Sequence, residues 1–315
     1  MTPVSAIQRL PFSETQQEEQ LVQDIVNDAV MRRQLFPSAQ VLRGFSRHQH
    51  NHQWQFTVQT QGGAFFIKAQ ELRYLPRFAA EQHSLLSILA TQTIAVGAPL
   101  ATGSVQRSGE PPMAYLILQH IPLAVHGDWF SAGQQLAQLH GHDSDRGYGF
   151  ERMTWCGEQA QDNRWNNDWT DFYLNQRLRP LLQQLQEQGI ALPGAAAALD
   201  GAAERLHQHQ PQASLLHGDL WSGNIGFNPD RQLSYPVLFD PASYYGDAEV
   251  DLAMTELFGR FPQRFYDGYQ SVRDISNGYE QRRPVYQLYH LLNHARQFGG
   301  SYIQQASNLM AQIRL

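Results

Sequence analysis

The sequence predicts an α+β fold of two lobes, with an antiparallel sheet and helices in the N-terminal lobe and mostly helices in the C-terminal lobe. Short runs in which apolar and polar residues alternate, the spacing of β-strands, lie before residue 119. After residue 123 the apolar residues recur at helical intervals instead. The 315 residues are enough to form two cores. We therefore expect an N-terminal lobe over 1–118, a hinge over 119–123 and a C-terminal lobe over 124–315.

The composition excludes several classes of partner. Hydrophobic residues make up 42% and charged residues 17% of the chain, the balance of a soluble globular protein. A net charge of −6 gives no basic surface for nucleic acid, and no apolar run is long enough to cross a bilayer. The single cysteine, Cys156, cannot form an internal disulfide, and the N-terminus lacks the layout of a secretion signal. We expect a cytoplasmic protein with no nucleic-acid or membrane partner; its oligomeric state stays open.

The N-terminal elements follow from their patterns. Ser13 and Gln16 have the spacing of a capping box and open a helix. The apolar face of this helix consists of Leu21, Val22, Ile25, Val26, Ala29 and Val30. Residues 54–58 alternate as in a half-buried strand, and residues 64–69 return as a second strand. A further strand over 114–118 leads into the hinge.

Helical patterns cover most of the chain beyond the hinge. They span residues 129–139, 169–185, 193–209, a segment ending at Phe258, 286–295 and a last helix from Ser301. One stretch among them has a different pattern. Two short apolar runs, Ile225–Phe227 and Val237–Phe239, flank a loop signal at 228–230, which predicts a β-hairpin.

Three oxygen-bearing side chains accompany this hairpin. Asp219 precedes it, Asn224 follows five residues later, and Asp240 comes at the end of the returning strand. The hairpin can therefore bring all three to one end. Carboxylate and amide oxygens suit Mg²⁺, which shares substrate phosphates with few protein ligands. In kinases, residues of these types at this spacing act as base, metal ligand and metal ligand, so the constellation favours phosphoryl transfer.

Each of these residues also has a purely structural interpretation. Asp240 followed by Pro241 is typical of a helix start, with the aspartate as N-cap and the proline at the first helical position. Asp219 and Asn224 could be loop residues that bond their own backbone. The combination of all three at kinase spacing, beside two apolar runs, favours the functional interpretation.

A lysine in the second predicted strand adds to this hypothesis. Lys68 lies among apolar residues, where it either snorkels at a sheet edge or points into a cleft. Glu81 follows thirteen residues later within a helical run. In kinases a strand lysine held by a helix glutamate positions the nucleotide phosphates. Lys68 and Glu81 are therefore candidate nucleotide-binding residues.

The segment between Gly44 and Trp54 is where a phosphate-covering loop would lie. Backbone N–H groups approach phosphates best where glycines remove steric bulk, and only Gly44 is present. The same segment contains His48, His50 and His52, which on a strand would share one face. Imidazole clusters can hold Zn²⁺ or Cu²⁺, but a mobile, solvated loop explains the same residues, and we favour the loop.

Together these residues identify a resemblance to the fructosamine/ketosamine kinase family, within the aminoglycoside phosphotransferase and protein-kinase-like superfamily. His-Gly-Asp-Leu-Trp-Ser-Gly-Asn at 217–224 resembles the family's catalytic loop, and Phe-Asp-Pro-Ala at 239–242 resembles its metal-binding segment. Residues 245–253 and the run Tyr-Gln-Leu-Tyr-His-Leu-Leu-Asn-His-Ala-Arg near the C-terminus are also similar. The first motif with its Trp-Ser-Gly-Asn extension is more specific than His-Gly-Asp alone, which indicates only the superfamily.

The resemblance implies a bilobal protein-kinase-like fold that uses ATP with Mg²⁺ to phosphorylate a sugar hydroxyl of free or protein-bound ketosamines, a deglycation repair. It implies that Asp219 accepts the hydroxyl proton, that Asn224 and Asp240 hold Mg²⁺, and that Lys68 and Glu81 set the phosphates. Trp221 would offer an aromatic wall near the sugar, and the hinge backbone at Gln119 and Ile121 would hold the adenine. Asp251 resembles the helix aspartate that braces the catalytic loop.

The chain departs from the family at one place. Members usually carry paired small residues in the nucleotide loop, whereas this chain has Gly44-Phe45 and extra residues before Trp54. The unusual loop motivates one rival function, a non-catalytic binding module on a kinase-like scaffold. A second rival is a phosphotransferase for an aminoglycoside, choline-like or other sugar acceptor, because an acidic C-terminal lobe is compatible with any cationic amine.

Overall fold

The computed structural model describes residues 12–35, 41–50, 53–60, 63–229 and 234–314. The chain divides into two compact units, each made of two stretches of sequence. The first unit comprises residues 1–82 and 98–120, and the second comprises residues 83–97 and 121–315. The two continuous lobes and the hinge expected from the sequence stay a prediction.

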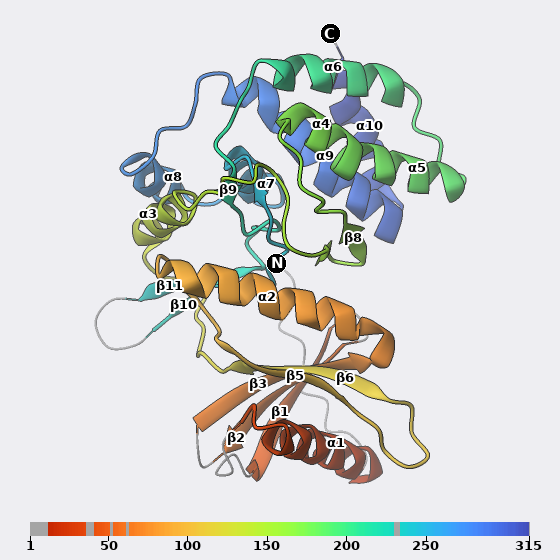
Figure 1. The fold of residues 1–315 in the computed structure, drawn as a ribbon, viewed down its shortest axis with the longest axis vertical. Coiled ribbons are helices and arrows are strands. Elements are labelled where there is room, and N and C mark those ends of the chain that lie inside the picture. Colours follow the sequence, from red (N-terminus) through yellow and green to blue (C-terminus); the bar gives the residue numbers. More distant parts are fainter. Residues whose placement is uncertain (1–11, 36–40, 51–52, 61–62, 230–233, 315) are drawn as a thin grey trace. The chain divides into compact units, whose positions relative to one another are not determined.

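The first unit contains a five-stranded antiparallel sheet in the order β1-β2-β3-β6-β5 (Figure 1). Its strands are β1 (Val41–His50), β2 (Gln53–Thr60), β3 (Gly63–Glu71), β5 (Pro99–Val105) and β6 (Met113–Gln119). In β2 the apolar side chains alternate with polar ones, and in β3 Phe65, Ile67 and Ala69 lie on the same side of the strand, so one face of the sheet is apolar. Phe56 and Val58 are fully buried, which confirms the alternation expected for β2.

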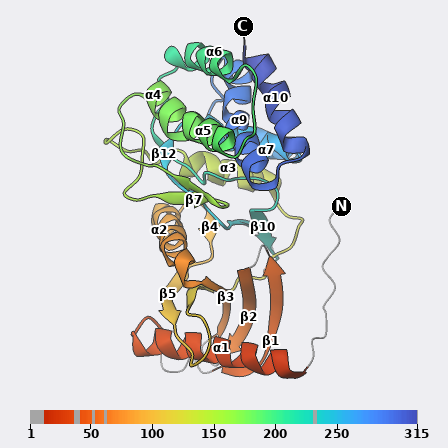
Figure 2. The ribbon, with the colours of Figure 1, turned by 90° about the vertical axis from the view of Figure 1, so that its right-hand side faces the viewer.

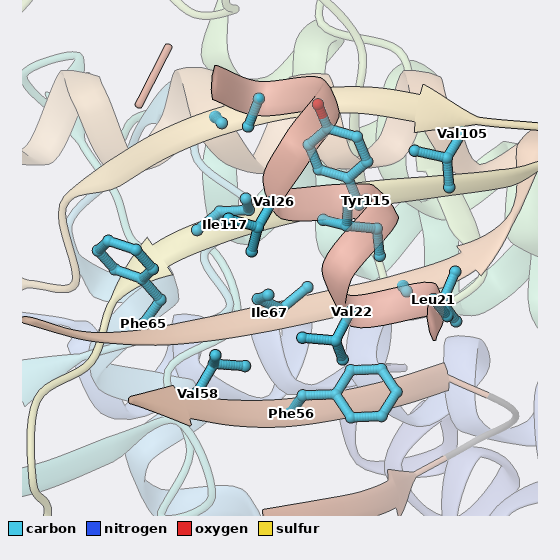
Figure 3. Packing of buried hydrophobic residues seen from close by; sticks show 14 of the residues in the cluster. Leu21, Val22, Val26, Phe56, Val58, Phe65, Ile67, Val105, Tyr115 and Ile117 are labelled. Atoms are coloured by element: carbon cyan, nitrogen blue, oxygen red, sulfur yellow. The ribbon is translucent and has the colours of Figure 1, made fainter. Parts of the chain in front are cut away.

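Helix α1 (Phe12–Met31) covers that apolar face (Figure 2). Its residues Leu21, Val22 and Val26 pack among Phe56, Ile67 and Ile117 of the sheet (Figure 3). The face predicted from helical spacing is therefore confirmed. Burying a Val, Leu, Ile or Phe side chain stabilises a fold by about 1.5–3 kcal/mol, so this cluster accounts for the sheet's attachment to α1. The side chain of the expected capping residue Ser13 lies outside the described part of the chain.

Helix α2 (Leu75–Thr91) follows β3 after the short 3₁₀ turn η1 (Leu72–Tyr74). Its first half belongs to the first unit and carries Glu81, and its second half belongs to the second unit. After α2 the chain forms β4 (Ala95–Val96), which pairs in parallel with β11 (Tyr235–Leu238) of the second unit.

The predicted hairpin is confirmed. Strand β10 (Ile225–Asn228) pairs antiparallel with β11, with Ile225 opposite Leu238, and β4 completes a three-stranded sheet. Two further two-stranded sheets join β9 (Ser214–Leu215) to β12 (Tyr245–Gly246) and β7 (Thr154–Cys156) to β8 (Gln159–Gln161). The loop tip expected at 228–230 ends at Asp230, which lies outside the described residues.

The rest of the second unit is helical, as expected (Figures 1 and 2). The helices are α3 (Trp129–Leu139), α4 (Trp169–Tyr173), the π-turn η2 (Leu174–Leu178), α5 (Arg179–Glu187), α6 (Ala195–His207), α7 (Glu249–Leu257), α8 (Gln263–Gln270), α9 (Tyr279–Phe298) and α10 (Ser301–Ile313). Helix α9 packs against α5, α6, α7 and α10. Among the described helices, none has both the length and the apolar character needed to cross a bilayer. The antiparallel sheet of one unit and the helices of the other confirm the α+β prediction.

Candidate active site

The hairpin places the predicted polar residues at one end of its two strands. Asn224 immediately precedes β10, and its carbonyl oxygen accepts a hydrogen bond of 3.1 Å from the N–H of Phe239. This bond extends the ladder by one pair beyond Ile225 and Leu238. Asp240, the next residue along the returning strand, therefore lies at the same end as Asn224.

Helix α7 holds the loop before the hairpin through Asp251. Its two carboxylate oxygens accept hydrogen bonds from the backbone N–H groups of His217 at 2.7 Å and Gly218 at 2.8 Å. Nε2 of His140 lies 3.1 Å from the same carboxylate. Burial alone would raise the pKa of Asp251, but the bond from His140 and the backbone donors hold it below its usual value. The bracing role expected for Asp251 is confirmed.

The imidazole of His217 fixes the loop from the other side. Nε2 lies 3.0 Å from the carbonyl oxygen of Phe239, and Nδ1 accepts the backbone N–H of Asp219 at 3.2 Å. These partners are satisfied together by one neutral tautomer, with the proton on Nε2. Burial lowers the pKa of His217, which agrees with a neutral ring.

Gly218 occupies a position that only glycine fits. Its φ is +85°, and an added Cβ would lie 2.2 Å from the carbonyl oxygen of Ala242. Both the left-handed backbone and the close approach exclude a side chain.

Asp219 lies at the centre of the group. The amide nitrogen of Asn224 donates to its backbone oxygen at 2.8 Å and approaches its Oδ2 at 3.4 Å. The thiol of Cys156 also donates to its carboxylate. Burial raises the pKa of Asp219 to about 7, the charges of Asp240 and Asp251 add to this rise, and the bonds from Cys156 and Asn224 oppose it. A carboxylate with a pKa near neutrality is suited to accept a proton from a substrate.

The structure contradicts the purely structural interpretation of Asp240 and supports that of Asn224. The interpretation of Asp240 as a helix cap is wrong, because residues 241–244 are not helical and α7 begins only at Glu249. Asp240 instead has a left-handed φ of +57°, a strained conformation that is found mostly at functional sites. Asn224 does bond the backbone of its own loop, so its structural role is real.

The donor set fits Mg²⁺. Because the amide nitrogen of Asn224 is used in bonding Asp219, the carbonyl oxygen is the atom that remains for a cation. Asp240 supplies a carboxylate at the same end of the hairpin. One amide and one carboxylate oxygen are a set that Mg²⁺ takes together with water and phosphate oxygens.

Lys68 and Glu81 form an ion pair within the first unit. Nζ lies 2.6 Å from Oε1 of Glu81, and the two side chains are 4% and 12% exposed. The snorkelling interpretation of Lys68 is wrong, because β3 lies between β2 and β6 rather than at an edge and the ammonium group is buried. That Lys68 faces the group around Asp219 across one cleft stays a prediction.

Three further predicted site residues have defined positions. Trp221 is 39% exposed, and its ring packs over Gly223, where an added Cβ would lie 2.3 Å from the ring. Gln119 ends β6 in the first unit, and its N–H bonds the carbonyl oxygen of Ala98. Ile121 begins the long stretch of the second unit. Their contacts with substrate and adenine stay predictions.

The prediction of a loop between Gly44 and Trp54 is wrong for the described residues of this segment. Strand β1 continues to His50, and His48 and His50 pair with Gln55 and Gln53 of β2. Strand β2 supplies the hydrogen-bonding partner. Because of this pairing, a polar segment with no strand pattern of its own becomes a strand. The side chains of His48 and His50 and the whole of His52 lie outside the described part of the chain, so metal binding by this run stays a prediction.

Two residues beside Asp219 were not predicted as site residues from the sequence. Nδ1 of His290, on α9, lies 3.7 Å from Oδ1 of Asp219, and Sγ of Cys156, at the end of β7, lies 3.9 Å from the same Nδ1. The segment of α9 was expected as a buried helix and as a run similar to the family, with no role in the site for His290. The signal that could have drawn attention to it is the spacing of His290 and Asn293, two polar residues three apart among the apolar residues of that run.

Comparisons with known proteins by family profile, by sequence and by structure all find fructosamine or ketoamine kinases. The sequence profile of the fructosamine kinase family matches residues 38–315. A "Probable ketoamine kinase" of Vibrio parahaemolyticus is 39% identical over 252 residues, which cover 79% of this chain and 84% of that protein. The solved structure of a "Putative fructosamine-3-kinase" from Haemophilus somnus is 26% identical with a TM-score of 0.81, covering 93% of this chain and 96% of that one.

A more distant solved structure confirms the protein-kinase-like fold. It is a thermostable mutant of an aminoglycoside phosphotransferase in a ternary complex with AMP-PNP and hygromycin B. The TM-score is 0.60 at 15% identity, covering 91% of this chain and 98% of that chain. At this identity the likeness concerns the fold alone.

Proposed function

The chain belongs to the fructosamine kinase family, and we propose that this ATP-dependent kinase phosphorylates a sugar hydroxyl of ketosamines, the adducts of sugars with amines, as a deglycation repair. The observation that carries the proposal is the position of Asp219. A loop fixed by Asp251 and His217 presents a carboxylate with a pKa of about 7 beside the oxygen donors Asn224 and Asp240.

Asp219 acts as the proton acceptor. At neutral pH a carboxylate of this pKa is substantially ionised, yet basic enough to take the proton of an attacking hydroxyl. Phosphoryl transfer needs little covalent chemistry from the protein, so positioning of the hydroxyl supplies most of the rate. Trp221, which is 39% exposed, offers the sugar an aromatic face beside this carboxylate.

Asn224 and Asp240 hold Mg²⁺, which when bound neutralises charge on the nucleotide phosphates. Lys68, held by Glu81, supplies a second positive charge for the phosphates. The backbone of Gln119 and Ile121 holds the adenine. The buried ion pair fixes the ammonium group in one position, and a fixed charge stabilises phosphate more than a mobile one.

The experiment that tests the proposal is ADP release against a panel of acceptors. Fructosyl-, ribulosyl- and erythrulosyl-lysine, free and on a peptide, are compared with an aminoglycoside and with choline. Turnover on at least one ketosamine, above that on the other amines, is the expected result. Phosphorylation of the aminoglycoside or choline without any ketosamine activity would decide for the rival acceptor.

The role of Asp219 is tested by Asp219→Asn, which keeps the size of the side chain and removes its basicity. We expect turnover to fall by about a hundredfold or more, because general-base catalysis contributes about that much. Retention of the thermal shift on Mg·ATP separates lost chemistry from lost binding. Near-normal turnover in the folded variant would remove Asp219 from the mechanism.

A further inference from the structure

Asp219 shares its surroundings with two side chains that the proposed phosphoryl transfer does not use. Cys156 comes from the end of β7, His290 comes from α9, and both lie beside the carboxylate of Asp219. Sγ of Cys156 lies 3.9 Å from Nδ1 of His290, and this Nδ1 lies 3.7 Å from Oδ1 of Asp219. All three donor atoms are within 4.8 Å of one another.

These separations resemble the edges of a tetrahedral zinc site. Zn–S bonds of about 2.3 Å and Zn–N and Zn–O bonds of about 2.0–2.2 Å put neighbouring donor atoms about 3.3–3.6 Å apart. The observed 3.7 and 3.9 Å exceed these edges by a few tenths of an ångström. Small side-chain movements therefore bring thiolate, imidazole and carboxylate to one ion.

His290 is held unusually loosely for a buried ring. It is 1% exposed, and its Nε2 has no hydrogen-bond partner among the described residues. Its Nδ1 has only the long approaches to sulfur and to Oδ1. Nδ1 is thus the ring nitrogen that faces Cys156 and Asp219, and neither of its approaches is as short as an ordinary N–H···O hydrogen bond, so Nδ1 is the atom that a metal would take. Burial lowers the pKa of His290 to about 3, which leaves a neutral ring with a lone pair for a metal.

The surroundings of Cys156 also suit a metal-bound thiolate. Nδ2 of Asn293, one turn after His290 on α9, donates to the backbone oxygen of Cys156 at 3.0 Å and approaches Sγ at 3.4 Å. Such a donor fixes the ligand and stabilises negative charge on sulfur. Cys156 is 2% exposed, whereas the side chain of Asp219 is 19% exposed, so an ion reaches the group from the side of Asp219.

We propose that Cys156, His290 and Asp219 form a binding site for a thiophilic divalent cation, Zn²⁺, and that its occupation inhibits the kinase. The second part rests on the proposed role of Asp219. Three protein ligands leave the fourth position for water, the thiol proton is released to solvent, and the carboxylate bound to the ion no longer accepts a proton from substrate. Sulfur and nitrogen donors favour Zn²⁺ over Mg²⁺, so this site and the Asn224–Asp240 pair differ in their metal.

A second cluster in the chain provides a comparison. His209, Asp247 and Glu249 also have donor atoms within 4.8 Å of one another. Their oxygens are already occupied, because Arg282 donates two hydrogen bonds to Glu249 and Tyr286 donates to Asp247. We expect this cluster to bind no metal, which makes His209→Gln the matched control for His290→Gln.

The binding experiment uses Co²⁺ as a spectroscopic probe in chelator-treated full-length protein. Tetrahedral cobalt with a thiolate ligand gives intense visible bands and a sulfur-to-cobalt charge-transfer band in the near ultraviolet. We expect one equivalent in the wild type and in His209→Gln, displaced by Zn²⁺, and loss of the charge-transfer band in Cys156→Ser. In His290→Gln the affinity should fall at least tenfold. Absence of the band in the wild type, or its persistence in Cys156→Ser, would overturn the site.

Inhibition is measured separately, as turnover with Mg·ATP against increasing Zn²⁺, each protein relative to its own zinc-free rate. The Zn²⁺ concentration for half inhibition should rise at least tenfold in Cys156→Ser and stay unchanged in His209→Gln. Equal inhibition of all three would refute the inhibitory role. A cobalt band in a protein that phosphorylates no ketosamine would support the metal site and contradict the proposed function. Normal turnover on a ketosamine without the band would support the proposed function and contradict the metal site. Circular dichroism confirms that each variant is folded.

Discussion

Replacement of Asp219 by Asn should stabilise the protein at alkaline pH even as it lowers turnover. Burial raises the pKa of Asp219 from 3.8 to about 7, so the folded state holds a proton that the unfolded state has lost. A carboxyl with a raised pKa contributes stability below pH 3.8, and this contribution is lost as pH rises through about 7. At about 1.4 kcal/mol per pKa unit, the loss is slightly more than 4 kcal/mol at pH 8. Because the side chain of Asp219 is 19% exposed, water reduces this loss of stability, and we expect a loss of about 2 kcal/mol at pH 8.

The assay is thermal unfolding of the wild type and Asp219→Asn without metal or nucleotide, at pH 5 and pH 8. The loss begins at pH 3.8, so the variant should melt about 1 °C higher than the wild type at pH 5 and about 3 °C higher at pH 8. At an unfolding entropy of about 2.1 cal/mol/K per residue, about 1 kcal/mol shifts the melting temperature of a chain of 315 residues by about 1.5 °C. Asp251→Asn is the matched control with the opposite sign: the pKa of Asp251 is lowered, so its loss destabilises at both pH values. An equal difference between wild type and Asp219→Asn at pH 5 and pH 8 would refute the reasoning.

The remaining predictions concern other parts of the site. Lys68→Gln should lower turnover at least a hundredfold and lower the melting temperature, because it removes the ammonium group that lies 2.6 Å from the buried carboxylate of Glu81. Adding Glu81→Gln to this variant should restore part of the stability but not the turnover. Gly218→Ala should destabilise by about 2–4 kcal/mol in urea unfolding, through its φ of +85° and the collision with a backbone carbonyl; a loss below about 0.5 kcal/mol would contradict the close approach. His290→Gln should flatten the acid side of the stability profile. The pKa of His290 is lowered from 6.5 to about 3, so its contribution is present above pH 6.5 and lost as pH falls toward 3, and an unchanged acid midpoint would count against burial of a neutral ring.

The parts of the site that the sequence predicts are those encoded within a short stretch. Asp219, Asn224 and Asp240 are separated by a hairpin whose two apolar runs define its strands, and the register then determines which residues meet at one end. The bracing by Asp251 follows from a recognisable motif. The fold class was predictable for the same reason, since the alternation in β2 and the helical spacing in α1 and α9 are local properties.

What the sequence does not predict depends on contacts between distant segments. Cys156 and His290 are 134 residues apart, and each has an ordinary structural explanation until the fold brings them to Asp219. The polar residues of β1 form a strand because β2 offers a free edge, a tertiary effect that overrides their own low strand preference. Strand β4 has only two residues, too few for any periodic signal.

The pairing of β4 with β11 has a consequence for dissection of the protein. The chain passes from one unit to the other at residues 82–83, 97–98 and 120–121, so a cut near residue 120 removes β4 from the sheet that it completes. A fragment starting at 124 would expose the backbone of β11, and an exposed strand edge recruits a second copy of itself. Self-association of such a fragment would then result from the cut and would say nothing about the oligomeric state of the intact chain.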